Sequence, residues 1–93
     1  MYYTYILYSP MLDKYYTGST YDINRRLEDH KRGKNKYTKI ASDWELKHIE
    51  KFETRSMAYK RELQIKNKKS KVYIENLISS IGIEHPDYNR EGH

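Results

Sequence analysis

The stretch YYTYILYSPMLDKYYTGST, residues 2–20, decides the fold that we predict for this chain. Residues 2–8 and 13–20 are rich in β-branched and aromatic side chains, which are typical of strands. Pro10 stands between them in SPML, residues 9–12, and a proline with its fixed φ is typical of a turn. We therefore expect two antiparallel strands that form a hairpin, with residues 9–12 as its loop.

The loop of this hairpin determines which residues face each other across it. With residues 9–12 in the loop, Tyr8 faces Asp13, and Tyr5 faces Tyr16. Directly opposed residues point to the same face of a sheet. The pattern therefore predicts that the two phenols of Tyr5 and Tyr16 lie side by side.

The rest of the chain indicates three helices and one more strand. The expected elements are a helix over residues 23–32, a strand over 44–52, a helix over 56–67 and a helix from 70 to 82. Asp22 would cap the first helix and Gly33 would end it. The order ββαβαα predicts an α+β fold, a small antiparallel three-stranded sheet flanked by helices. We expect one domain over residues 1–82 and a flexible tail over 83–93.

The positive charge is concentrated in two segments of the chain. The net charge is +5, and residues 25–39 and 60–71 each carry a local net charge of +5. Such clusters suit a polyphosphate partner, although a solvated lysine-rich surface has the same composition. The candidate nucleic-acid contacts are Arg25, Lys31, Arg32, Lys34, Lys36, Lys39, Lys66, Lys68 and Lys69.

Several classes of protein are disfavoured by the composition. The chain has no cysteine, which excludes disulfides, thiolate zinc sites and cysteine nucleophiles and is compatible with a reducing cytosol. It has no apolar run near the roughly 20 residues that a bilayer needs, so we expect a cytoplasmic protein without membrane contact. The four histidines show no close metal-ligand spacing, and neither a glycine-rich phosphate loop nor a Ser–His–Asp grouping stands out.

Glu62 is the anomaly of the second expected helix. It is the one carboxylate of a basic segment, and its spacing from Ala58 and Ile65 places it on the apolar stripe of the helix. Acidic side chains are rarely buried without a partner. The alternative is a surface ion pair of Glu62 with Arg61 or Lys66.

Arg26 and His30 share a face of the first expected helix. They are four residues apart, and Arg26 borders the apolar stripe formed by Ile23 and Leu27. An arginine at such a border can lean over the sheet instead of into bulk solvent. For each residue the alternative is an ordinary surface or helix-flank position.

The order of these motifs resembles that of the GIY-YIG nuclease domain. YTG, residues 16–18, stands for Y-I-G, and in YTY, residues 3–5, which takes the place of G-I-Y, only the tyrosine Tyr5 matches. Arg26 follows Gly18 by eight residues, which is the spacing of the arginine in this family.

Two further positions extend the resemblance over residues 2–80. His30 matches a position that holds histidine or tyrosine in the family, and AYKRELQIK, residues 58–66, is similar to the helix that carries the metal-binding glutamate, here Glu62. The chain looks closest to the small stand-alone bacterial members. These members are related to the nuclease domain at the start of the excinuclease C subunit.

The resemblance implies a mechanism for each matched residue. Family members cut DNA phosphodiesters with one divalent metal, so Glu62 would bind Mg²⁺ or Mn²⁺. Arg26 would hold a phosphate oxygen. Tyr5 or Tyr16 would help to deprotonate the attacking water, and His30 would position that water or contact the phosphate. The free phenol has a pKa near 10, so an adjacent cation would have to assist.

The neighbours of Tyr16 have different expected roles. Tyr15 would point to the opposite face and pack on the sheet, and Gly18 would leave open space where a phosphate backbone approaches.

Two functions are compatible with this sequence. The first is a metal-dependent DNA endonuclease that is structure-selective and serves DNA repair or recombination. Because nothing in the sequence resembles a separate DNA-reading module, we expect a protein partner to target it. The second is a nucleic-acid-binding module of the same fold with little or no nuclease activity. A protein-interaction domain is a more distant alternative, and RNA remains open as a substrate.

Overall fold

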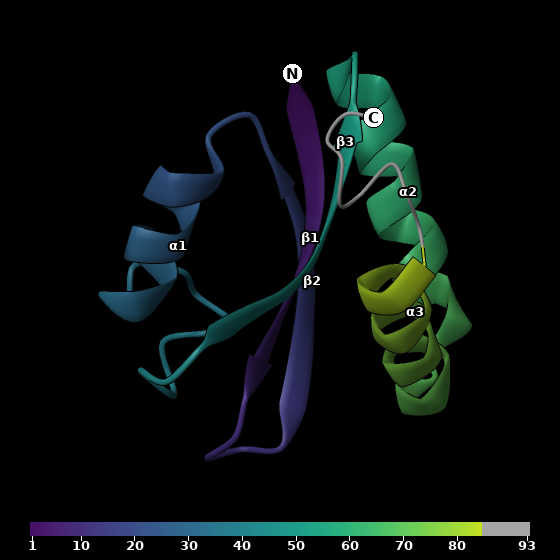
Figure 1. Cartoon of the computed structure of the whole chain (residues 1–93). Coiled ribbons are helices and arrows are strands. Elements are labelled where there is room, and N and C mark those ends of the chain that lie inside the picture. The colour runs from purple at the N-terminus through teal and green to yellow at the C-terminus, as the bar shows by residue number, and fades with distance from the viewer. Residues whose placement is uncertain (85–93) are drawn as a thin grey trace.

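The computed structural model describes residues 1–84 of the protein and arranges them in three layers (Figure 1). Its elements are β1 (Tyr2–Ser9), β2 (Lys14–Thr20), α1 (Ile23–Lys31), β3 (Glu45–Phe52), α2 (Arg55–Lys68) and α3 (Lys71–Glu84). Helix α1 covers one face of the sheet, and α2 and α3 cover the other (Figure 1). The predicted α+β fold with the order ββαβαα is therefore confirmed.

The sheet places β2 at an edge. The strand order is β2-β1-β3, and β1 pairs with both neighbours in antiparallel orientation. Because β1 is central, its side chains are covered by helices on both faces. The outer edge of β2 is open, since no further strand pairs with it in the described part of the chain.

The register of the β1–β2 hairpin differs from the prediction by two positions. Tyr8 faces Tyr15 instead of Asp13, and Tyr5 faces Gly18. The reason is Asp13, which adopts a left-handed φ of 53°, donates its backbone N–H to the Ser9 carbonyl at 2.7 Å and so belongs to the turn.

A shift of two residues leaves every side chain on its predicted face, because the side-chain period of a strand is two. Tyr5 and Tyr16 therefore share a face as diagonal neighbours, with their ring centroids 6.3 Å apart.

A hydrophobic cluster holds α1 against its face of the sheet. Tyr5, Leu7 and Trp44 are buried there, and Ile23 and Leu27 of α1 pack against them. The apolar stripe that the sequence indicated on this helix is thus the contact that orients α1. It brings the neighbouring positions of α1 over β1 and β2.

Helix α2 packs on the opposite face through the predicted stripe. Ala58, Glu62 and Ile65 are the buried residues of this helix, and the hydroxyl of Thr4 on β1 donates to the Ala58 carbonyl at 2.7 Å. A carboxylate therefore does lie in an otherwise apolar contact, as the spacing of Glu62 predicted.

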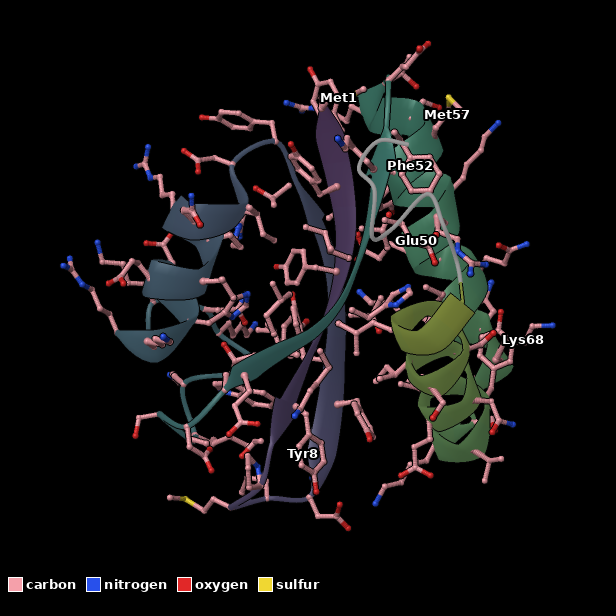
Figure 2. The ribbon with its side chains drawn as sticks, viewed as in Figure 1. Met1, Tyr8, Glu50, Phe52, Met57 and Lys68 are labelled. Atoms are coloured by element: carbon pink, nitrogen blue, oxygen red, sulfur yellow. The ribbon has the colours of Figure 1, made fainter. Side chains whose placement is uncertain are left out.

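A second carboxylate links β3 to α2. Glu50 accepts hydrogen bonds from Arg61 Nε at 2.8 Å and from His48 Nε2 at 2.7 Å. Figure 2 shows Glu50 on the side of the sheet that faces α2. Burial would raise the pKa of Glu50, but the bonds from His48 and Arg61 outweigh it and lower that pKa to about 2. Arg61 is thus engaged with Glu50 and not with Glu62.

The helix ends agree with the predictions in part. The carboxylate of Asp22 caps α1 by accepting the Arg25 N–H at 3.1 Å, as predicted. Helix α3 passes through Gly82, where we predicted its end, because one glycine costs only about 1 kcal/mol in a helix interior. Of the expected tail, residues 85–93 lie outside the described residues. The proposed domain boundary at residue 82 stays a prediction.

Among the described residues, no helix combines the length and the apolar character that crossing a membrane requires.

Candidate active site

The predicted site residues lie around the edge strand β2. Tyr5 and Tyr16 extend from the face covered by α1, which also carries His30. Glu62 belongs to α2 on the other face, yet it accepts a hydrogen bond from Lys66 Nζ at 2.6 Å, and the same Nζ lies 5.8 Å from the centroid of the Tyr16 ring. Lys66 therefore bridges the two faces around the free edge of β2.

Tyr5 is part of a buried chain of hydrogen bonds. Its hydroxyl lies 2.9 Å from His30 Nε2, and His30 Nδ1 lies 2.7 Å from Thr38 Oγ1. All three side chains are buried. In a neutral imidazole one nitrogen donates and the other accepts, so the directions of the two hydrogen bonds are coupled.

Burial changes the proton affinities of this chain. It raises the pKa of the Tyr5 phenol above the ordinary range, with Tyr16 adding to the rise and the positive charge of Arg26 opposing it. It also lowers the pKa of His30 to about 4, an effect that Arg26 strengthens. Tyr5 is thus a neutral phenol, and His30 a neutral imidazole, at neutral pH.

The depressed pKa of His30 makes the folding stability depend on pH. Below pH about 6.5 the unfolded chain binds a proton at this histidine that the folded chain refuses until pH about 4. The contribution of His30 to the free energy of unfolding is therefore fully present above pH about 6.5 and is lost as the pH falls toward 4. We expect acidification from pH 7 to pH 5 to remove about 2 kcal/mol from the free energy of unfolding through His30 alone.

Urea denaturation at the two pH values measures this loss. His30→Gln should lose about 2 kcal/mol less than the wild type over the same interval, since glutamine does not titrate. The interval stops above the range in which Glu50, with its pKa of about 2, gains its proton. An equal loss in both proteins would contradict the assignment to His30.

Gly18 provides the space in which Tyr5 lies. A Cβ at this position would lie 2.6 Å from the Tyr5 hydroxyl oxygen, 2.8 Å from Cζ and 3.1 Å from Cε2 of Tyr16. The expectation that Gly18 opens room for a phosphate backbone is therefore wrong, because the end of the Tyr5 ring fills that room. The glycine of the motif lets the two tyrosines pack together.

Gly18→Ala should destabilise the protein by about 1–3 kcal/mol, because the added methyl group overpacks a fully buried site. In a Tyr5→Leu background the same change should cost much less, which a double-mutant cycle measured by urea denaturation detects. Gly33→Ala is the matched control. Its cost comes from a left-handed φ of 76°, so Tyr5→Leu should not relieve it. Equal costs of Gly18→Ala in both backgrounds would rule out the proposed contact.

Tyr16 has a different environment from Tyr5. It is half-buried on the edge strand, and its hydroxyl accepts a long hydrogen bond of 3.4 Å from Asn35 Nδ2. Its ring lies 5.0 Å from the His30 ring, centroid to centroid. Tyr16 is thus the less buried of the two tyrosines.

Arg26 lies half-buried on α1, one turn before His30. Burial is the largest influence on the pKa of both Tyr5 and His30. The positive charge of Arg26 opposes the rise in the Tyr5 pKa and adds to the fall in the His30 pKa. A guanidinium on this face of α1 is the kind of group that binds a phosphate oxygen.

Glu62 is 8% exposed and has two hydrogen-bonding partners. Ser19 Oγ of β2 donates to Oε1 at 2.7 Å, and Lys66 Nζ donates to Oε2 at 2.6 Å. The alternative of a surface pair with Lys66 is right about the partner, but the carboxylate is buried. Each carboxylate oxygen retains acceptor capacity beyond these two bonds.

The donor set around Glu62 fits one kind of metal. In the described part of the chain, no three His, Cys, Asp or Glu side chains gather to hold an ion. A metal would therefore depend on Glu62, with the Ser19 hydroxyl beside it, and on water and substrate for its other ligands. Mg²⁺ keeps several waters and needs only one or two carboxylates, so these residues fit it.

The predicted nucleic-acid contacts are all exposed, but they do not all surround the tyrosines. Lys34, Lys36 and Lys39 lie in the loop that follows α1. Lys68 stands over the ring of Tyr73 at 5.3 Å, and Figure 2 shows it extending from α2 away from the sheet. The basic surface thus consists of a part beside the site and a part at the end of α2.

Sequence reasoning missed three polar residues of the site, Ser19, Asn35 and Thr38. Each contacts a predicted residue through a side-chain hydrogen bond: Ser19 to Glu62, Asn35 to Tyr16 and Thr38 to His30. Two of them belong to the irregular basic loop, which has no periodicity to interpret. The sequence offered a signal for Ser19 alone. It lies three residues after Tyr16 on β2, so strand alternation places it on the opposite face, toward α2.

The fold and this constellation define a class that the comparisons with known proteins identify. A family profile described as the GIY-YIG catalytic domain matches residues 1–76. The chain therefore belongs to the GIY-YIG catalytic domain family, as its motifs indicated.

Individual proteins similar to this chain carry the name UPF0213. The UPF0213 proteins of Staphylococcus aureus strains Mu3 and Mu50 are each 48% identical to it over 52 residues, which are 55% of this chain and 63% of theirs. The match thus spans less than two thirds of those relatives. The solution NMR structure of a UPF0213 protein from Bacillus halodurans is 32% identical, covers 91% of this chain and 90% of that chain, and superposes with a TM-score of 0.56.

Proposed function

We propose that this protein is a metal-dependent DNA endonuclease that hydrolyses phosphodiester bonds. The observation that supports this most is the grouping around β2, where Tyr16 on one face is joined through Lys66 to the buried carboxylate of Glu62 on the other. Phosphodiester hydrolysis needs a proton acceptor, a cation for the phosphate and a metal ligand close together. The residues around β2 are of these three types.

Tyr16 suits the role of proton acceptor better than Tyr5. Tyr5 is 1% exposed and its hydroxyl is hydrogen-bonded to His30 at 2.9 Å, whereas Tyr16 is half-buried and its hydroxyl has a long bond of 3.4 Å from Asn35. In the reaction the water oxygen would bond to phosphorus as the bond to the leaving sugar oxygen breaks. The Tyr16 oxygen would take the water proton while its own phenolic proton passes to solvent, and the leaving sugar oxygen would take a proton from solvent. The Lys66 ammonium lies 5.8 Å from the ring centroid and offsets the negative charge there.

Tyr5 and His30 then pack against the Tyr16 ring on the face of the sheet that α1 covers. The Tyr5 and His30 rings lie 6.3 and 5.0 Å from the Tyr16 ring, centroid to centroid, and their own hydrogen bond holds them in place. Because burial makes His30 a weaker base and the Tyr5 phenol a weaker acid, both can hold the Tyr16 ring with little competition for the proton of the water. We propose a positioning role for both residues.

Arg26 and Glu62 would act on the phosphate from two sides. Arg26 would hold a non-bridging phosphate oxygen and offset the charge that builds on it. Glu62, with the Ser19 hydroxyl, would hold the metal, and Mg²⁺ or Mn²⁺ when bound would polarise the phosphate and stabilise the leaving oxygen. Lys66 has to release Glu62 Oε2 for this and becomes available to the substrate.

The exposed lysines would supply affinity without sequence choice. Contacts to the phosphate backbone are salt-sensitive and read no bases, so a protein partner would direct the enzyme to its site. The relation to the excinuclease C domain suggests a role in DNA repair or recombination, in the cytoplasm.

One observation favours a second function, a nucleic-acid-binding module without activity. Lys66 Nζ already neutralises Glu62 at 2.6 Å, where a metal ion would bind. If this ion pair persists in the presence of DNA and metal, the fold binds nucleic acid but cannot cut it.

Incubation with supercoiled, flapped and branched DNA tests the two functions. We expect the wild-type protein to cut at least one of these substrates with Mg²⁺ or Mn²⁺, and EDTA to stop the cutting. Retained DNA binding without cutting on any substrate would favour the binding module.

A further inference from the structure

The basic loop after α1 is attached to the candidate site at two points. Asn35 Nδ2 donates to the Tyr16 hydroxyl at 3.4 Å, and Thr38 Oγ1 is hydrogen-bonded to His30 at 2.7 Å. The residues between these two anchors are Lys36 and Tyr37. Tyr37 follows Asn35 by two residues, and each residue spans less than about 4 Å of chain. The backbone of Tyr37 is therefore close to Asn35, whose side chain contacts Tyr16.

Tyr37 is an aromatic residue that the fold does not use. It is 71% exposed, the largest exposed fraction among the large apolar side chains of the described residues. Lys36 Nζ lies 5.9 Å from its ring centroid, and Lys34 and Lys39 on either side are exposed as well. An exposed ring among cations is the combination with which proteins bind single-stranded nucleic acids, since cations meet phosphates and the ring stacks on a base.

The loop holds Tyr37 in a defined backbone conformation. Asn35 Oδ1 accepts the backbone N–H of Tyr37 at 2.8 Å and that of Thr38 at 3.1 Å, and Lys39 N donates to the Asn35 carbonyl at 3.0 Å. The indole N–H of Trp44 also donates to the Thr38 carbonyl at 2.8 Å. Binding therefore does not have to order the backbone of this loop, which favours affinity.

We propose that Tyr37 stacks on an unpaired nucleobase of the substrate strand beside the cleaved phosphate. The proposal rests on the proposed function for the polymer, and it adds the substrate class: DNA with a single-stranded segment at the cut, such as a flap or a branch. In a regular duplex each base is already covered by its neighbours. A tyrosine ring can reach the face of a base only where the strand is unpaired.

Binding of a flapped DNA with 2-aminopurine in its single strand tests the proposal. EDTA prevents cutting during the measurement, and stacking quenches the fluorescence of this base. We expect the wild type and Tyr37→Phe to quench it and to bind alike, whereas Tyr37→Ala should lose the quenching and bind about tenfold to hundredfold more weakly. Fully paired DNA of the same length should bind Tyr37→Ala and the wild type equally.

Tyr21→Ala is the matched control, because Tyr21 is 63% exposed but has no lysine beside it in the chain. The proposal is overturned if Tyr37→Ala quenches and binds like the wild type, if Tyr21→Ala loses as much, or if the wild type does not bind the flap. Cutting assays with Mg²⁺ separate this result from the proposed function. Quenching without cutting would support the stacking role of Tyr37 and contradict the proposed endonuclease activity. Cutting at the same rate by the wild type and Tyr37→Ala would support the endonuclease and contradict the stacking role.

Discussion

Replacing Glu62 with glutamine should lower DNA cutting at least about a thousandfold. The metal that this carboxylate would hold contributes several kcal/mol to the transition state, and each 1.4 kcal/mol is a factor of ten in rate. Glutamine retains the size and one acceptor oxygen for Ser19, but it has no charge to bind a divalent cation. The rate of conversion of supercoiled to nicked DNA, measured at several Mg²⁺ and Mn²⁺ concentrations, gives the loss.

The same substitution should leave the fold intact. Lys66, the other partner of Glu62, is 44% exposed, and ion pairs with such a partner contribute about 1 kcal/mol or less. Far-ultraviolet circular dichroism and the urea midpoint establish this. Glu53→Gln is the matched control, because Glu53 is an exposed carboxylate nine residues earlier, and it should cut like the wild type. Metal-dependent cutting that survives Glu62→Gln would place the metal elsewhere.

The position of Glu62 is the part of the site that the sequence predicted best. A carboxylate at helical spacing between Ala58 and Ile65 can hardly avoid the packed face of its helix, and the structure buries all three. The partner could not be chosen in the same way, since Arg61 and Lys66 are both within one turn. The choice depends on β3, where Glu50 takes Arg61 and leaves Lys66 to Glu62.

The hairpin register shows a different limit of prediction. Alternation of side chains predicted the shared face of Tyr5 and Tyr16, and this result is insensitive to a shift of two residues. The register itself depends on whether Asp13 belongs to the strand or to the turn. Asp13 belongs to the turn because it adopts a left-handed backbone conformation and donates its N–H to the Ser9 carbonyl. The strand propensities of the residues do not reveal either feature.

The loop between α1 and β3 was the least predictable segment. It contains no regular period, yet it supplies Trp44 to the core and Thr38 to His30. These contacts join residues on elements that are close only after the sheet and α1 have packed. The sequence therefore indicated the loop's charge and not its contribution to the site.

Tyr16→Phe should lower the cutting rate about a hundredfold to ten-thousandfold, the usual contribution of a positioned general base. The change removes the hydroxyl and with it the long hydrogen bond from Asn35, but the ring keeps its contacts with Tyr5, His30 and Lys66. Because Thr38 still holds the loop to His30, DNA binding should change little. Single-turnover rates on a substrate that the wild type cuts, together with the dissociation constant in EDTA, separate the chemical step from binding.

The neighbouring tyrosine provides the control. Tyr15 lies on the opposite face, where its hydroxyl donates a long, exposed hydrogen bond of 3.5 Å to Glu75. Tyr15→Phe should therefore cut at the wild-type rate. Equal losses in Tyr16→Phe and Tyr15→Phe would indicate a general effect on the strand.

Tyr5→Phe distinguishes positioning from proton transfer. It leaves His30 Nε2 buried without its partner, which should cost about 1–3 kcal/mol of stability. If Tyr5 only holds Tyr16 in place, cutting by Tyr5→Phe should fall less than cutting by Tyr16→Phe, although Tyr5→Phe is the less stable protein. The opposite order, in which Tyr5→Phe abolishes cutting and Tyr16→Phe does not, would assign the base to the buried phenol. A base at that position would need the raised pKa of Tyr5 to be reversed by substrate or metal, so the comparison also determines where the attacking water must bind.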